Sequence, residues 1–300
     1  MDEALEALLE KLRRAAQHAR DFMDSYQPWH HGDPYRVVCD FEPHPTKPDI
    51  EKRCWSLELT REPPLAYWAA LTGELLYQLR SVLEHLAYAA ASRDSHPYAP
   101  PSGVGFPIFL KRNKYEQAGV HGAEPRLAGM SDTVRALIKE LQPFDPGWDG
   151  EPRKHPLWLL HELSDTDRHE SPHIAAGFAR LGNIQVGQRH NVEVLAFRPR
   201  EGPFEDGAKI ATATVRWLDP VDAEVHVNLS LGPQIAFSVP GRAAQKPYAG
   251  LPVLRTLADI HGFVVRQVFY DRLGHYLFPD EIIQGIPLPA DIHPPWIVYQ

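Results

Sequence analysis

The sequence has few cysteines and no long apolar run. Its two cysteines, Cys39 and Cys54, form neither a C-x-x-C pair nor a metal-binding spacing, so we predict reduced thiols rather than a disulfide framework. No window approaches the roughly 18 consecutive apolar residues that a membrane-spanning helix requires. The first ten residues contain acids and lack the basic and apolar stretches of a secretory signal. We therefore expect a cytoplasmic protein with no membrane partner.

Several widespread enzyme motifs are also absent. The chain has no G-x-x-x-x-G-K-[ST] phosphate loop, no G-x-G-x-x-G between a strand and a helix, and no G-x-S-x-G nucleophile elbow. His161 and Glu162 begin like the H-E-x-x-H zinc pattern, but Asp165 stands where the second histidine would be. These absences disfavour nucleotide-driven, dinucleotide-dependent, α/β-hydrolase and zinc-peptidase chemistry.

Positive charge is in deficit. The 31 Lys and Arg residues are outnumbered by 39 Asp and Glu residues, which gives a net charge of −8. Proteins that coat nucleic acid non-specifically depend on clustered cations, so this class is disfavoured, whereas a local basic site on an acidic body is not. A hydrophobic content of 43% over 300 residues is enough for a substantial core in one large domain or two smaller ones.

Helical spacing of apolar residues marks the expected helices. In the first of them the apolar residues from Leu5 to Met23 form one stripe. The second is entered through Pro63 and Pro64, and Asp132 is expected to cap the third. The ranges are 3–24, 65–91, 132–141, 156–169 and 251–277.

Alternating apolar and polar residues mark the expected strands. Residues 35–42 and 55–60 form the first two, joined by a proline-containing loop, with a cysteine in or beside each. A second group, 192–197, 208–217, 223–231 and 234–239, reads most simply as an antiparallel meander.

Together these elements predict an α+β fold, in which a helical bundle packs against an antiparallel β-sheet. The expected parts are an N-terminal helix and β-hairpin over 1–64, a helical region over 65–183, and a meander with a C-terminal helix over 184–300. Because strands occur on both sides of the central helices, the first and last parts either form one shared domain or stand apart.

The helix over 65–91 has an unusual polar face. Its apolar side chains occupy the opposite arc, so the helix is cleanly amphipathic. A solvated face usually carries Lys and Glu, whereas this one is rich in tyrosine and poor in lysine, which is typical of a half-buried cleft. Arg80 can pair with Glu84 at i, i+4, and the plainer interpretation is a surface ion pair with hydrogen bonds between helices. The polar set is Glu74, Tyr77, Gln78, Arg80, Ser81, Glu84, His85 and Tyr88.

The stretch Arg80-Ser-Val-Leu-Glu-His85 resembles the R-x4-H pattern of HEPN ribonucleases, small helical enzymes in which the Arg and His of paired protomers form the active cleft. Ser81 matches the small polar residue that often follows the Arg. The match departs from the family at Ala87, where a Tyr is common, because Tyr88 comes one position later. The large β region is not part of a minimal HEPN bundle. The blocks 79–88 and 157–169 also resemble segments of bacterial proteins of similar size.

This resemblance implies a metal-independent endoribonuclease that needs no cofactor, takes RNA as substrate, acts as a homodimer and works in a toxin or phage-defence setting, with the antitoxin left open. His85 would move the 2′-hydroxyl proton, and Arg80 would stabilise charge on the phosphate. Glu84 would orient Arg80. Tyr77, Ser81 and Tyr88 would support the site.

The helix over 156–169 ends in a dense polar segment. Structurally, Arg168 and His169 suit the negative end of the helix dipole, and Asp165 can pair with Arg168. In a functional interpretation, Asp165, Arg168 and His169 form a second wall of the Arg80 and His85 cleft, with the two polar helix faces meeting. A third interpretation is a metal site from Asp165, Asp167, His169 and His173.

Three functions therefore remain open from the sequence: a HEPN-type ribonuclease, a metal-dependent hydrolase, and a non-catalytic module that binds a ligand or a protein. A bound metal would favour the hydrolase, and a shallow or absent cleft around Arg80 would favour the binding module.

Overall fold

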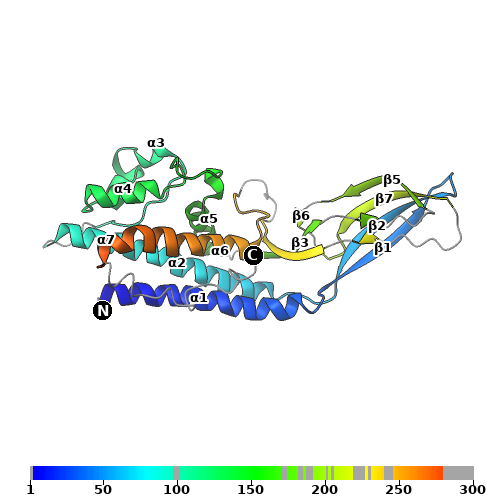
Figure 1. The fold of residues 1–300 in the computed structure, drawn as a ribbon, viewed down its shortest axis with the longest axis horizontal. Helices are drawn as coiled ribbons and strands as arrows, with labels where there is room; N and C mark the ends of the chain where they lie inside the picture. The colour runs from blue at the N-terminus through cyan, green and yellow to red at the C-terminus, as the bar shows by residue number, and fades with distance from the viewer. Residues whose placement is uncertain are drawn as a thin grey trace.

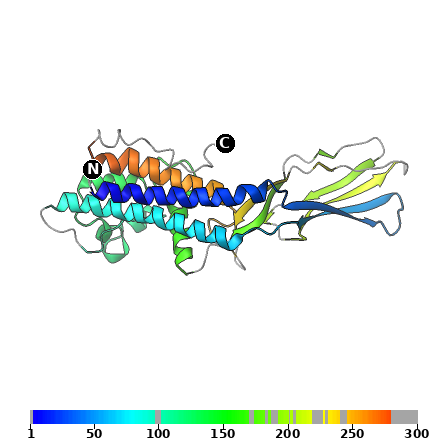
Figure 2. The ribbon, with the colours of Figure 1, turned by 90° about the horizontal axis from the view of Figure 1, so that it is seen from below.

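The computed structural model shows an elongated molecule, with a helical bundle at one end and an antiparallel β-sheet at the other (Figure 1). A view from below shows the long helices lying side by side (Figure 2). The α+β class predicted from the sequence is confirmed. The residues that the structure describes are 3–96, 102–169, 174–181, 185–186, 192–200, 202–203, 206–218, 227–228, 231–239 and 246–279.

The two longest helices are α1 (Glu3–His30) and α2 (Leu65–Ser95), which pack against each other. Helix α1 extends past the predicted end because Tyr26 and Trp29 continue its buried stripe. The Trp29 ring is 2% exposed and meets the Trp68 ring of α2 edge-on, with 5.2 Å between centroids. Burial of these large rings secures the end of α1 beside the start of α2.

The bundle is completed by α4 (Asp132–Glu140), α5 (Pro156–His169) and α6 (Val253–Gly262). Helix α6 continues through a π-helical stretch, Phe263–Gly274, into α7 (His275–Leu277), so the C-terminal rod has the predicted length with wider turns. Short helical pieces connect α2 to α5: α3 (Arg112–Tyr115), Gly119–His121, Glu124–Leu127 and Pro152–Lys154. Among the described helices, none combines the length and apolar character needed to cross a membrane.

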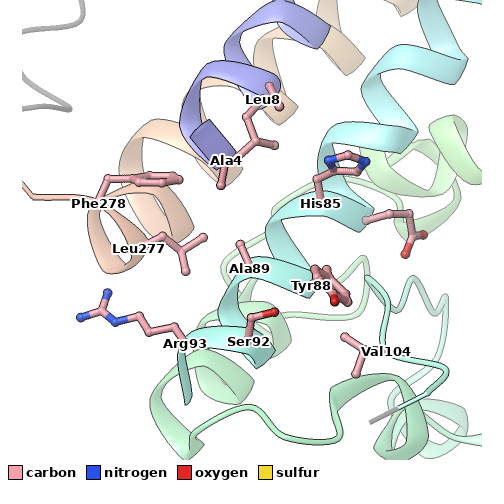
Figure 3. Close-up of a pocket in the computed structure, with 12 residues that line it drawn as sticks. Ala4, Leu8, His85, Tyr88, Ala89, Ser92, Arg93, Val104, Leu277 and Phe278 are labelled. Carbon is pink, nitrogen blue, oxygen red and sulfur yellow. The ribbon is translucent and has the colours of Figure 1, made fainter. Parts of the chain in front are cut away.

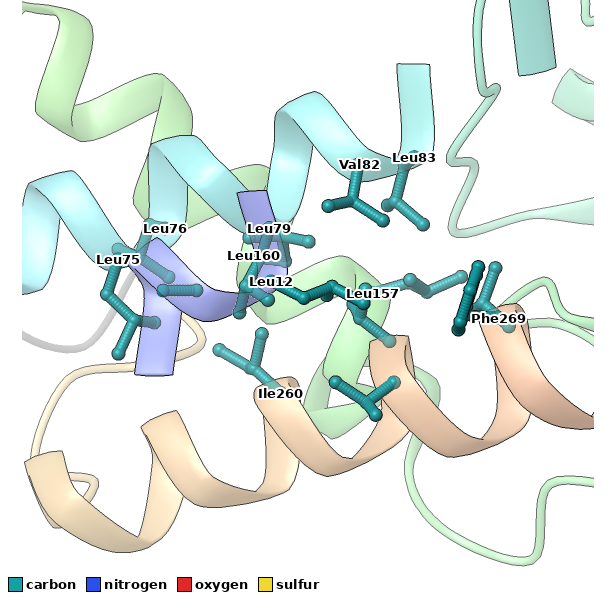
Figure 4. Close-up of a cluster of buried hydrophobic side chains, with 14 of the residues drawn as sticks. Leu12, Leu75, Leu76, Leu79, Val82, Leu83, Leu157, Leu160, Ile260 and Phe269 are labelled. Carbon is teal, nitrogen blue, oxygen red and sulfur yellow. The ribbon is translucent and has the colours of Figure 1, made fainter. Parts of the chain in front are cut away.

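The bundle core is built from leucine-rich stripes that meet between α1, α2, α5 and the C-terminal rod (Figure 4). Leu79, Leu160 and Ile260 come from three different helices and are each fully buried. Burying one such side chain stabilises the fold by about 1.5–3 kcal/mol, so the helical periodicity of the sequence accounts for the bundle.

The main sheet has the strand order β1-β2-β7-β5 and is antiparallel throughout. Its strands are β1 (Tyr35–Pro43), β2 (Ile50–Leu59), β7 (Lys209–Trp217) and β5 (Val192–Pro199). Because β2 pairs with β7, segments from both ends of the chain share one sheet, and side chains of β2 and β7 form a second, smaller core. Cys54 lies opposite Asp40, which places Cys54 and Cys39 on opposite faces of the sheet as free thiols.

The remaining strands overturn the predicted simple meander. Strand β9 (Leu231–Phe237) pairs with β3 (Ile174–Leu181), and β6 (Gly202–Pro203) lies on the other side of β3. Strand β4 (Gln185–Val186) pairs with β8 (Val227–Asn228). The end of the region predicted to be helical, 65–183, is therefore strand β3. Its sequence, Ile-Ala-Ala-Gly-Phe-Ala-Arg-Leu, lacks the alternation that marks a half-buried strand, so local pattern gave no signal. Most of the predicted strand 223–231 lies outside the described residues.

Two element starts also differ from the prediction. Ser131, and not Asp132, caps α4, because its hydroxyl accepts a hydrogen bond from the Val134 N–H at 3.5 Å. Strand β2 starts at Ile50, earlier than predicted, because Ile50 is 5% exposed and the strand pairs with β7 along this stretch.

Candidate functional site

Arg80 is held in a three-part contact on the polar side of α2. Its side chain is 13% exposed, forms an ion pair with Glu84, and donates a hydrogen bond from Nη2 to the carbonyl of Phe106 at 3.0 Å. The second carboxylate oxygen of Glu84 accepts the Phe106 N–H at 3.0 Å. Glu84 therefore holds Arg80 in place, and the two side chains together satisfy both backbone groups of Phe106.

This contact holds an extended segment, residues 104–109, against the bundle. Phe106 is fully buried, so its backbone polar groups need partners inside the protein. Gln142, also fully buried, continues the pattern by donating to the Pro107 carbonyl at 2.9 Å and accepting the Phe109 N–H at 3.0 Å. Gly105 allows the close approach, because a Cβ there would lie 2.5 Å from the Glu84 carboxylate.

The end of this segment forms one wall of a hollow of about 610 Å³, called here the basic pocket. Arg80 lies in its wall, together with three other cationic side chains and two histidines, and none of the described residues that line it is Asp or Glu. The lining residues are Arg80, Ile108, Phe109, Leu110, Lys111, Lys114, Val120, His121, Gly122, Arg126, Trp158 and His161.

His161 of α5 lines the same pocket as Arg80, and the charge of Arg80 acts on its imidazole. Burial lowers the pKa of its imidazole, and the positive charges of Arg80 and Arg126 lower that pKa further, against the opposing influence of Glu162 and Asp165. The imidazole is consequently neutral at pH 7 and able to accept a proton. Arg80 of α2 and His161 of α5 therefore line the same hollow.

The other cations of the basic pocket are available to a ligand. Arg126 and Lys111 are exposed and form no ion pair within the part of the chain that the structure describes. Among the described residues, the Lys114 ammonium donates to the neutral Gln117, at 3.1 Å, and to no carboxylate. Trp158 adds a half-buried ring, with its centroid 5.3 Å from that of His161. The pocket thus combines unneutralised positive charge with a flat aromatic surface.

His85 lines a different hollow, of about 710 Å³, at the end of the bundle (Figure 3). We call it the terminal pocket. Burial lowers the pKa of His85, Lys11 lowers it further, and Glu84 opposes this. Arg80 does not line the terminal pocket and His85 does not line the basic pocket. Within one chain, the structure brings Arg80 together with His161 and separates it from His85, as their roughly 140° offset around the helix implies.

The predicted supporting residues of α2 are spread over its surface. Tyr77 is 63% exposed, Tyr88 is 57% exposed and lines the terminal pocket, and Ser81 is half-buried. None of the three lines the basic pocket.

On α5, Asp165 is exposed. The side chains of Arg168 and His169 and the whole of His173 lie outside the described residues, so the second wall expected from them stays a prediction. Asp167 packs so closely on Gly73 of α2 that a Cβ at Gly73 would collide with its carboxylate.

Burial raises the pKa of the Asp167 carboxyl, and the charge of Glu74 raises it further. Within the described ranges, no group of three or more His, Cys, Asp or Glu side chains is placed to hold a metal ion. The predicted metal set includes His169 and His173, whose side chains fall outside those ranges.

Sequence reasoning missed most of the basic pocket. Lys111, Lys114, His121 and Arg126 lie in the irregular connection between α2 and α4, where no periodic pattern draws attention to them. The available signal was the local run Lys-Arg-Asn-Lys at 111–114, a concentration of positive charge in an acidic chain.

Comparison with known proteins adds no relative to this picture. No family model, no curated protein and no solved structure matches this chain.

Proposed function

We propose that the chain binds RNA, holding a backbone phosphate in the basic pocket. The observation that carries this proposal is the composition of the pocket wall: its described residues include four Lys and Arg side chains, two histidines and no carboxylate, on a chain with a net charge of −8. Guanidinium and ammonium groups are the usual protein ligands of phosphate. The volume of about 610 Å³ falls in the range of small-ligand sites, and the Trp158 ring offers a surface on which a base can stack.

The nearness of Arg80 and His161 favours a second step, cleavage of the bound RNA without a metal or cofactor. Neutral His161 would take the proton of a ribose 2′-hydroxyl, and the 2′-oxygen would attack the adjacent phosphorus. The bond to the 5′-oxygen would break as His121 protonates that oxygen, leaving a 2′,3′-cyclic phosphate and a 5′-hydroxyl. Arg80 and Arg126 would stabilise the charge that develops on the phosphate.

This version differs from the arrangement implied by the R-x4-H resemblance, in which His85 is the acid or base. Because Arg80 and His85 line different pockets, that arrangement needs a homodimer in which a second chain brings its own His85 to Arg80. The two versions name different histidines, so variants distinguish them.

Binding is tested with a fluorescently labelled single-stranded oligoribonucleotide. Arg126→Glu should weaken binding at least about tenfold, because it removes one charge-assisted phosphate contact and introduces a repulsive one. Lys52→Glu is the matched control, since Lys52 is exposed on β2, far from the pocket in sequence and fold. Equal weakening by both variants, or by neither, contradicts a phosphate site in the basic pocket.

Cleavage is tested on total cellular RNA in the presence of EDTA, together with growth of the producing host. His161→Ala should lower the cleavage rate about a hundredfold or more, whereas His85→Ala and the loop control His44→Ala should not. If His85→Ala is the inactive variant, the dimeric R-x4-H version replaces ours. RNA binding by a wild type that cuts nothing would identify a non-catalytic RNA-binding module.

A further inference from the structure

The terminal pocket lies where three helical segments end (Figure 3). Leu8 of α1 and Phe278 after α7 close it on one side, and the last turns of α2 form the other side. Its volume of about 710 Å³ is within the range of pockets that enclose small organic ligands. It is separate from the basic pocket, so a ligand here does not depend on the proposed action on RNA.

Small side chains keep this space open. Ala4 and Ala7 of α1 are exposed and Ala89 of α2 is half-buried, and all three face the terminal pocket. Other exposed positions nearby on α1 carry long charged side chains such as Glu6 and Glu10, which would fill such a hollow. With alanine at these positions, the two helices present a smooth apolar wall to the space between them.

The charged groups of the wall are already occupied. Both carboxylate oxygens of Glu84 accept hydrogen bonds, one from Arg80 and the other from the Phe106 N–H. The Arg93 guanidinium donates to the Tyr276 carbonyl and lies over the Tyr276 ring, 4.7 Å from its centroid. Glu84 thus offers a ligand no free carboxylate oxygen, and the Arg93 guanidinium, although these contacts do not neutralise its charge, is directed toward Tyr276.

Neutral polar groups remain. His85, Tyr88 and Ser92 line the pocket and form no side-chain hydrogen bond within the described residues. Burial and Lys11 lower the pKa of His85, so its ring is uncharged at pH 7 and both donates and accepts hydrogen bonds. The pocket therefore combines apolar walls with neutral hydrogen-bonding groups on one side, that of α2.

We infer that the terminal pocket is a binding site for an uncharged, mainly apolar small molecule that contains an aromatic ring and a hydrogen-bonding group. The ring packs between the alanines of α1 and α2 and the Phe278 side chain. The polar group bonds to His85.

The test uses N-phenyl-1-naphthylamine, an uncharged aromatic amine whose fluorescence rises in apolar surroundings, titrated into the full chain. Wild type should show saturable binding of one molecule per chain. Ala7→Phe and Ala89→Phe should each weaken it at least about tenfold by filling the space, and Ala70→Phe is the matched control, because Ala70 is an exposed alanine of α2 outside the pocket wall. His85→Leu, which keeps the volume and removes the hydrogen bond, should weaken it by a factor of about three to ten.

Ala7 is exposed, so the Ala7→Phe variant should fold, and circular dichroism with thermal unfolding verifies this before the titration. The absence of saturable binding to wild type overturns the inference. So does equal affinity of wild type and folded Ala7→Phe, because the probe would then bind elsewhere. Arg126→Glu separates this inference from the proposed function, since it should lose RNA and keep the probe.

Discussion

At the scale of single residues, Arg80 has a structural task that accompanies any chemical one. Its guanidinium and the Glu84 carboxylate satisfy the backbone of a buried residue, Phe106, while the same guanidinium lines the basic pocket. A loss of activity in an Arg80 variant would therefore not identify a catalytic role, because the pocket wall would move as well. Among the residues that the structure describes, the side chains of His161 and Arg126 form no hydrogen bond to a backbone group, so they are the cleaner sites for mutation.

The first prediction concerns Glu84. Glu84→Ala removes the partner of Arg80 and leaves the buried Phe106 N–H without its acceptor, so it should lower the free energy of unfolding by about 2–3 kcal/mol. Asp24→Ala, at an exposed position of α1, is the control and should change stability by less than about 0.5 kcal/mol. Urea unfolding followed by circular dichroism measures both. Equal stability of the two variants would show that the contact with Phe106 contributes little.

Sequence could predict only the local half of this arrangement. The i, i+4 spacing predicts the pair of Arg80 and Glu84, and the structure contains it. The contact with Phe106 is 22 residues away from Glu84, and the meeting of Arg80 with His161 depends on how α5 packs on α2. Such contacts follow from tertiary packing, which a helical wheel cannot represent.

At the scale of elements, helix α5 begins at an unusual cap. The residue before its first turn is His155, whose Nδ1 accepts the Leu157 N–H at 3.1 Å, so the imidazole takes the place of the usual Ser or Asp side chain. The ring is 2% exposed and lies edge-on between Trp148 and Phe263, with 4.7 Å between centroids on each side. Burial lowers the pKa of His155 to about 4.

The second prediction is a loss of stability in mild acid. Between the unfolded pKa of 6.5 and the folded value of about 4, the unfolded chain binds a proton at His155 and the folded chain does not. The free energy of unfolding should therefore fall as the pH falls through this window, by about 3 kcal/mol in full. His155→Asn keeps a capping side chain and should show a correspondingly flatter profile, whereas His44→Asn should follow wild type. Parallel profiles for wild type and His155→Asn would refute this.

The third prediction concerns a contact that ties three elements together. Asp94, at the end of α2, accepts hydrogen bonds from the Ser131 N–H and the Tyr276 hydroxyl, both at 2.7 Å. Burial raises the pKa of Asp94, but these hydrogen bonds outweigh it and lower the pKa below the usual 3.8. The contribution of ionised Asp94 is thus present above pH 3.8 and is lost as the pH falls through the folded value.

Asp94→Asn should accordingly destabilise the protein by about 2 kcal/mol at pH 7 and by less at about pH 3, because below the unfolded pKa of 3.8 the unfolded wild-type chain takes up a proton at Asp94. Tyr276→Phe should cost about 1 kcal/mol at pH 7. Chemical unfolding at both pH values measures the difference. A gap between Asp94→Asn and wild type that stays constant with pH would show that the carboxylate charge does not matter.

The elements themselves were largely predictable, because each long helix buries one stripe and therefore carries a 3.6-residue period. The range of α5 agrees with its prediction, and α4 and α2 differ from theirs at their ends only. Strand β3 was missed because its side chains do not alternate, and its pairing with β9 comes from contacts distant in sequence. The wider π-helical turns of Phe263–Gly274 could likewise not be predicted from the spacing of the apolar residues.

At the scale of the whole molecule, the net charge and the position of the basic pocket limit where RNA can bind. The net charge of −8 repels nucleic acid from most of the surface, so attraction must come from a restricted region. The basic pocket lies among the bundle helices and their connections, between α2, α5 and the segment 108–126, and not on the sheet. RNA bound there would make few phosphate contacts, which gives the last prediction its magnitude.

The last prediction is a shallow salt dependence of RNA binding. Each phosphate contact to a single strand contributes a slope of about −0.7 to a plot of log K against log salt concentration. The basic pocket has four Lys and Arg side chains, so the slope should not exceed about −3 in magnitude, and Arg126→Glu should reduce it by about 1. Lys52→Glu should leave it unchanged. Fluorescence anisotropy at a series of salt concentrations gives these slopes. A much steeper slope that both variants reduce equally would mean that RNA lies across a wide surface, and the basic pocket would then lose its special role.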